Sequence, residues 1–149
     1  MLALSISPLR VLFPHSRSLL WIGARRRVMG LAAFSYSVLH LAIFTMSIGR
    51  IDWIIQGMAF ASMWTGWIAF ALLAIVAAIS NDRAHRRFGG WWKPLQRLVY
   101  PVAILTLAHW LLLTRSPVEA LAHALPYLAL VIAARIVSAK RLRRGAKGL

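Results

Sequence analysis

The stretch Leu31-Ala32-Ala33-Phe34-Ser35-Tyr36-Ser37-Val38-Leu39-His40 lies inside an apolar segment that runs from about Val28 to Ile48. At roughly 1.5 Å per residue, a helix of this length covers the ~30 Å hydrocarbon core of a bilayer. Apart from what His40 carries, the segment is without charge. An ionisable group at such a depth is costly, and by default it marks a functional site. The segment therefore predicts a transmembrane helix with a functional histidine.

The composition also indicates a membrane protein. Of the 149 residues 60% are hydrophobic, and the mean hydropathy is +0.70. The 18 Lys and Arg against three acids give a net charge of +15. The bases fall between apolar runs without any motif that reads or stacks on bases, so we expect lipid and not nucleic acid as the partner of this charge. The absence of cysteine excludes disulfides, thiolate metal sites, cysteine-held iron–sulfur clusters and a cysteine nucleophile.

Three further apolar segments predict membrane spans. The second span lies within 54–80, and we expect it to begin at Met63 or a little earlier. The third covers about 98–113, and the last covers about 119–137. Residues 1–7 are apolar but too short to span. We therefore predict an all-α membrane protein, a bundle of four full transmembrane helices plus the remnant of a preceding one at the N-terminus.

The chain is expected to form a single domain over 1–149, shortened at its N-terminus, with a basic, partly disordered cytoplasmic tail over 138–149. Basic residues support this topology because they are distributed unevenly. Five lie in 8–27, five in 81–97 and six in 135–147, whereas the other two connections carry only Arg50 and Arg115. If the spans alternate in direction, the positive-inside rule places the three basic regions, and the C-terminus, in the cytoplasm.

Two histidines lie at matching depths in this arrangement. His40 follows Arg27 by 13 residues, and His109 follows Arg97 by 12. Both arginines mark the cytoplasmic surface, so the imidazoles lie ~20 Å and ~18 Å into the membrane on helices that run in the same direction. Two level histidines in a helix bundle predict a pair of axial ligands for haem iron. The alternative is that each histidine only hydrogen-bonds a neighbouring helix.

The other histidines are poorer ligand candidates. His85 precedes two arginines in a basic loop, which disfavours further positive charge, and His123 lies near the interface in the first turns of the last span. Gly30, Ala33 and Ser37 share a helix face with His40. These small residues would either let a flat ligand approach the backbone or serve ordinary packing between helices.

Several segments resemble the ferric-reductase-like transmembrane domain and, within it, the MsrQ (YedZ) family of haem-binding membrane subunits. They follow the family's order over nearly the whole chain and comprise Ile6-Ser7-Pro8-Leu9-Arg10, Arg26 to Phe34 with Leu39-His40-Leu41, Thr65-Gly66-Trp67, Phe88 to Tyr100, Ala103-Ile104-Leu105 and Ala108-His109-Trp110. The resemblance implies a b-type haem and a place in the bacterial inner membrane.

The chain departs from that family in two respects. The family usually has six membrane helices, and this chain begins inside the second. The family motif also has a histidine, implied to serve haem binding near the cytoplasmic face, where this chain has Gln96. Because glutamine is a poor iron ligand, we expect one haem, bound by His40 and His109.

The resemblance implies an electron-transfer subunit of an oxidoreductase system, with no bond chemistry of its own. Electrons would come from a cytoplasmic flavin reductase or from quinol, with FMN or quinone as further cofactors that the resemblance allows. They would pass outward to a periplasmic molybdenum-containing methionine-sulfoxide reductase or to ferric iron. The alternative function is a haem-free membrane scaffold or interaction protein derived from the same fold.

Overall fold

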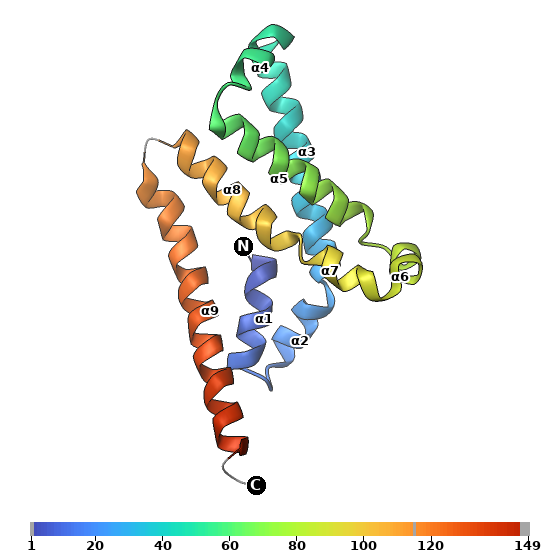
Figure 1. Cartoon of the computed structure of the whole chain (residues 1–149), viewed down its shortest axis with the longest axis vertical. Coiled ribbons are helices and arrows are strands. Elements are labelled where there is room, and N and C mark those ends of the chain that lie inside the picture. Colours follow the sequence, from blue (N-terminus) through green and yellow to red (C-terminus); the bar gives the residue numbers. More distant parts are fainter. Residues whose placement is uncertain (1, 115, 147–149) are drawn as a thin grey trace. The chain divides into compact units, whose positions relative to one another are not determined.

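The computed structural model describes residues 2–114 and 116–146, and within these parts of the chain the regular structure is helical (Figure 1). The helices are α1 (Leu2–Leu12), α2 (Arg17–Ala24), α3 (Arg26–Ile48), α4 (Ile51–Gly57), α5 (Ala61–Ala78), α6 (Asp82–Phe88), the 3₁₀ helix η1 (Gly89–Trp91), α7 (Trp92–Gln96), α8 (Val99–Leu113) and α9 (Pro117–Ala146). The prediction of an all-α membrane protein is confirmed.

The predicted spans correspond to α3, α5, α8 and α9. In the described residues α3, α5 and residues 117–141 of α9 are long and apolar enough to cross a membrane by themselves. Helix α8 has 15 residues and becomes a fourth candidate only together with the segment 82–96, from which it is bent by 41°. A straight helix of that length reaches only ~22 Å, less than the hydrocarbon core.

Three regions contain more helix than the sequence suggested. The expected loop at 8–27 includes the end of α1 and all of α2, and the expected loop at 81–97 contains α6, η1 and α7. The tail expected to be partly disordered over 138–149 is helical to Ala146, and 147–149 lie outside the described residues.

Pro8 is tolerated inside α1 although it removes a backbone donor.

The chain divides into two compact units, and the site lies in one of them. Residues 1–26 and 118–149 form one unit, in which α1 packs against α2, and residues 27–117 form the other. In the second unit α5 and α8 form the closest helix pair. Helix α3 has no buried residue, and its Phe34 stacks on Phe70 of α5 with ring centroids 5.9 Å apart. This leaves space between α3 and the α5–α8 pair.

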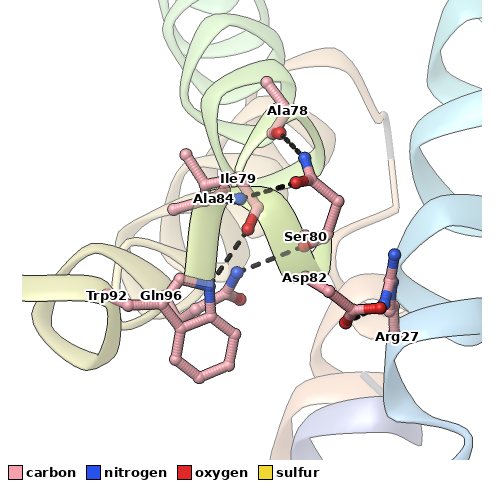
Figure 2. A network of polar contacts seen from close by, with 9 residues as sticks. Arg27, Ala78, Ile79, Ser80, Asp82, Ala84, Trp92 and Gln96 are labelled. Atoms are coloured by element: carbon pink, nitrogen blue, oxygen red, sulfur yellow. Dashed lines mark hydrogen bonds and ion pairs between the residues drawn. The ribbon is translucent and has the colours of Figure 1, made fainter. Parts of the chain in front are cut away.

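A set of polar contacts joins the end of α5 to α7, and we call it the clasp (Figure 2). The Trp92 indole Nε1 donates to the carbonyl of Ile79 over 3.0 Å, and Gln96 Nε2 donates to the Ser80 hydroxyl oxygen over 3.2 Å. The Ser80 hydroxyl in turn donates to the carbonyl of Val76 over 2.6 Å. The clasp therefore fixes the path of the chain between α5 and α8.

Two further contacts shape the turn beside the clasp. The Asn81 side chain caps α6, since its Oδ1 accepts from the amide of Ala84 over 2.7 Å. Arg27, at the beginning of α3, forms an ion pair with Asp82 over 2.9 Å (Figure 2). The basic end of this unit is thus held by side-chain contacts that lie close together in space.

Candidate functional site

A cavity of about 230 Å³ lies between α3, α5 and α8, and it contains both predicted site histidines. Thirteen residues line it: Ser37, His40, Leu41 and Phe44 from α3; Met63, Gly66, Trp67, Ala69, Phe70 and Leu73 from α5; Thr106, His109 and Leu113 from α8. The structure therefore brings His40 and His109, 69 positions apart in the sequence (109 − 40), to one site. Hydrophobic side chains form most of its wall.

His109 is held in a defined orientation. Its Nδ1 lies 2.6 Å from the backbone carbonyl oxygen of Ser62 in the first turn of α5. A carbonyl oxygen only accepts, so the ring must carry its proton on Nδ1. In the neutral imidazole the lone pair is then on Nε2, which is the arrangement that metal-binding histidines adopt when a second group orients them.

The Ser62 carbonyl accepts a second hydrogen bond. The Thr65 hydroxyl donates to it over 2.8 Å and also lies 3.1 Å from the carbonyl of Ala61. Ser62 thus contributes its backbone carbonyl to the site.

Gly66 allows His109 to approach α5. A Cβ atom at this position would lie 2.7 Å from Cε1 and 2.8 Å from Nδ1 of the imidazole, closer than real contacts allow. The ring could not move away without stretching its 2.6 Å bond to Ser62. The sequence signal for this role was only a glycine inside a predicted helix, and the sequence analysis did not identify Gly66 as a site residue.

His40 differs from His109 in its surroundings. Its side chain lines the same cavity and the residue is exposed, and no hydrogen bond or ion pair to it exists within 2–114 and 116–146. Of the small residues that share its helix face, only Ser37 also lines the cavity, and a Cβ at Gly30 would meet open space. Both ring nitrogens of His40 are therefore available to a ligand.

The remaining polar groups of the cavity wall include two hydroxyls that are satisfied by their own helices. Ser37 donates to the carbonyl of Ala33 over 2.9 Å, and Thr106 donates to that of Val102 over 2.8 Å. The described part of the chain has no group of three or more His, Cys, Asp or Glu that could hold a metal ion. Two imidazoles in an apolar wall suit haem iron better than a zinc or copper site, which would need more ligands.

The donor set of the site fits a haem. The two histidines supply neutral nitrogen ligands, one with its proton already placed on the far nitrogen. The cavity volume lies below the ~300–1,000 Å³ of pockets that enclose drug-sized ligands, so a porphyrin would extend beyond it. The sparse packing of α3 against α5 leaves an apolar space for a flat group of this kind.

The other polar candidates lie elsewhere. His85 is on α6 and meets the Trp92 ring edge-on with centroids 4.8 Å apart, whereas His123 is exposed and its Nδ1 lies 2.9 Å from the carbonyl of its own helix at Glu119. Gln96 is bonded in the clasp and does not line the cavity. Glu119 lies in the first turn of α9.

Comparison with known proteins gives consistent matches. The family model described as "Ferric reductase like transmembrane component" matches residues 1–107. The protein-methionine-sulfoxide reductase heme-binding subunit MsrQ of Rhodospirillum rubrum is 33% identical over 152 aligned positions, covering 97% of this chain and 70% of that protein. The protein of the same name from Azospira oryzae is 34% identical, covering 95% of this chain and 61% of that protein. No solved structure matches the chain.

Proposed function

Because the chain belongs to the ferric reductase-like transmembrane component family, we propose that it binds one haem b between His40 and His109 and carries electrons across the bacterial inner membrane. The observation that carries this proposal is the shared cavity, in which His109 has its proton on Nδ1 and His40 has no other partner in the described part of the chain. Two relatives named as haem-binding subunits support the choice of cofactor.

The residues of the chain would hold the haem and set its reduction potential. When bound, haem supplies a one-electron couple of its iron. The His109 imidazole, hydrogen-bonded through Nδ1, becomes a more basic ligand, which favours the oxidised iron. The apolar wall excludes water from the iron and so acts in the opposite direction on the potential. The protein performs no bond chemistry, and the reaction belongs to its partners.

The visible spectrum of the detergent-purified protein tests this proposal. We expect a red protein whose dithionite-reduced form has the sharp bands of a low-spin b-type haem. Each variant His40→Ala and His109→Ala should lose the bis-imidazole spectrum, whereas His85→Ala, which changes a histidine outside the cavity, should keep it. A wild-type protein that stays colourless after haem supplementation would instead support the haem-free scaffold.

The proposed orientation of the chain in the membrane rests on the distribution of its basic residues. The basic connections and the C-terminus would lie in the cytoplasm and α4 in the periplasm, because 16 of the 18 bases fall on one side. The chain contains no cysteine, so single cysteines can report on sidedness without a background. In intact spheroplasts a membrane-impermeant maleimide should label Ile51→Cys and spare Arg86→Cys. The reverse pattern would show that the topology is inverted.

The partners are the most specific part of the proposal. The names of the relatives favour a methionine-sulfoxide reductase system as the partner. We propose that the acceptor is a periplasmic reductase of this kind. The family resemblance noted for the sequence suggests a cytoplasmic flavin reductase or quinol as donor, with FMN or quinone at the donor side. The dithionite-reduced protein should be reoxidised by a molybdenum-containing reductase together with methionine sulfoxide. Faster reoxidation by ferric citrate in a matched anaerobic assay would favour ferric iron as the acceptor.

A further inference from the structure

The two histidines of the cavity are held to very different degrees. His109 has a 2.6 Å hydrogen bond to a backbone carbonyl and lies against the backbone of Gly66, on a helix that packs closely with α5. His40 has no such bond within the described residues, and its helix has no buried residue. The carbonyl that orients His109 belongs to a helix turn, so it is itself fixed.

We propose, on the basis of the haem-binding function above, that the two axial positions are unequal. His109 is the permanent ligand, positioned by the Ser62 carbonyl and by the absence of a side chain at Gly66. His40 is an exchangeable ligand, so that a small neutral molecule such as a diatomic gas binds to the iron on the α3 side. The site is then a ligand-binding centre as well as an electron carrier.

The physical reason is the cost of releasing each imidazole. Moving His109 off the iron also breaks the hydrogen bond from its Nδ1 to the Ser62 carbonyl. The Nδ1–H group is then left without an acceptor in an apolar wall, which is unfavourable. Moving His40 breaks no hydrogen bond or ion pair in the described part of the chain. Within the described residues the ring contact between α3 and α5 is the Phe34–Phe70 stack, and it lies closer to the beginning of α3 than His40 does. The iron would therefore become accessible on the side of α3, where His40 can be released.

Gly66 is a positioning residue in this arrangement. The variant Gly66→Ala places a Cβ against the imidazole and should displace it from Ser62. Loss of a group that orients a metal ligand typically lowers metal affinity about 10–100-fold, and we expect a loss of haem affinity in that range. Gly30→Ala is the matched control, since this helical glycine has open space around its Cβ position, and it should leave haem affinity unchanged.

Carbon monoxide titration of the reduced protein tests the exchange. We expect the wild type to form a CO adduct with a shifted Soret band. His40→Ala should form an adduct with the same spectrum, because His109 stays opposite the gas in both, and should bind CO at least about tenfold more tightly, since the apparent affinity of the wild type is reduced by the fraction of time that His40 is released. Imidazole added to oxidised His40→Ala should restore the low-spin spectrum.

The outcomes separate this inference from the function on which it rests. A wild-type protein that takes up no haem overturns the proposed function and the inference together. A red, low-spin wild type that excludes CO, or a Gly66→Ala variant with the haem affinity of Gly30→Ala, overturns the inference alone. So does a His109→Ala variant that retains haem and yields the wild-type CO spectrum. If His109→Ala does not fold, the comparison of Gly66→Ala with Gly30→Ala still decides.

Discussion

The cavity and the clasp lie toward opposite ends of α5, and they use polar side chains in opposite ways. In the clasp the Trp92 and Gln96 side chains reach acceptors on the chain itself, at Ile79 and Ser80. In the cavity His109 uses one nitrogen and leaves the other, and His40 has no partner in the part of the chain that the structure describes. Polar groups that are satisfied within the chain hold the fold, and polar groups left in an apolar wall are ready for a ligand.

The largest effect should come from removing both imidazoles of the cavity. The double variant His40→Ala/His109→Ala is expected to bind little haem, because the remaining wall offers apolar groups, the Trp67 indole, the weakly ligating thioether of Met63 and hydroxyls bonded to their own helices. The ratio of Soret to protein absorbance after purification measures this. As controls, His15→Ala and His123→Ala lie outside the cavity and should retain the full ratio. Haem retained by the double variant would place the ligands elsewhere.

The number of haems is the sharpest test of the contrast between the two regions. Gln96 is a poor iron ligand and is occupied by Ser80, so we expect one haem per chain. Pyridine-haemochrome analysis against total protein should return a ratio of about one, and the single change Gln96→His should be required before a second haem binds. A ratio near two in the unmodified protein would show that the clasp region binds haem as it stands.

A smaller effect is expected from a change inside the clasp. Trp92→Phe removes the donor to the Ile79 carbonyl and should lower the free energy of unfolding by about 1 kcal/mol. The melting temperature in detergent should fall by a few degrees while the haem spectrum stays the same. Trp91→Phe is the matched control, because this neighbouring side chain is 75% exposed. Loss of haem in Trp92→Phe with Trp91→Phe intact would contradict the separation of the two regions.

The smallest effect should come from the ion pair beside the clasp. The side chains of Arg27 and Asp82 are 48% and 80% exposed, and pairs as exposed as this contribute only ~0–1 kcal/mol and are screened by salt. Asp82→Asn should therefore leave the melting temperature within about a degree at both low and high ionic strength. A salt-dependent loss of several degrees would mean that this pair holds α3 to the turn after α5.

The clasp region also shows what a sequence pattern leaves open. The five basic residues of 81–97 suggested a basic loop between two membrane spans, but α6, η1 and α7 occupy most of this segment. The Asn81 cap and the positive φ of Gly89 accommodate two short helices, and Trp92 and Gln96 bind them to the end of α5. Contacts between residues 13 and 16 positions apart have no periodic signature, so these helices were not expected.

The sequence by itself determined the helical membrane class, the four apolar segments and the similar spacing of His40 and His109 from a preceding arginine, because hydrophobic length and charge position are properties of the chain before it folds. Only the tertiary structure decided that both histidines line one cavity, that the Ser62 carbonyl holds His109, and that Gly66 gives the imidazole its place. These depend on how closely α8 approaches α5. That distance is fixed by side-chain packing between helices, which local sequence does not encode.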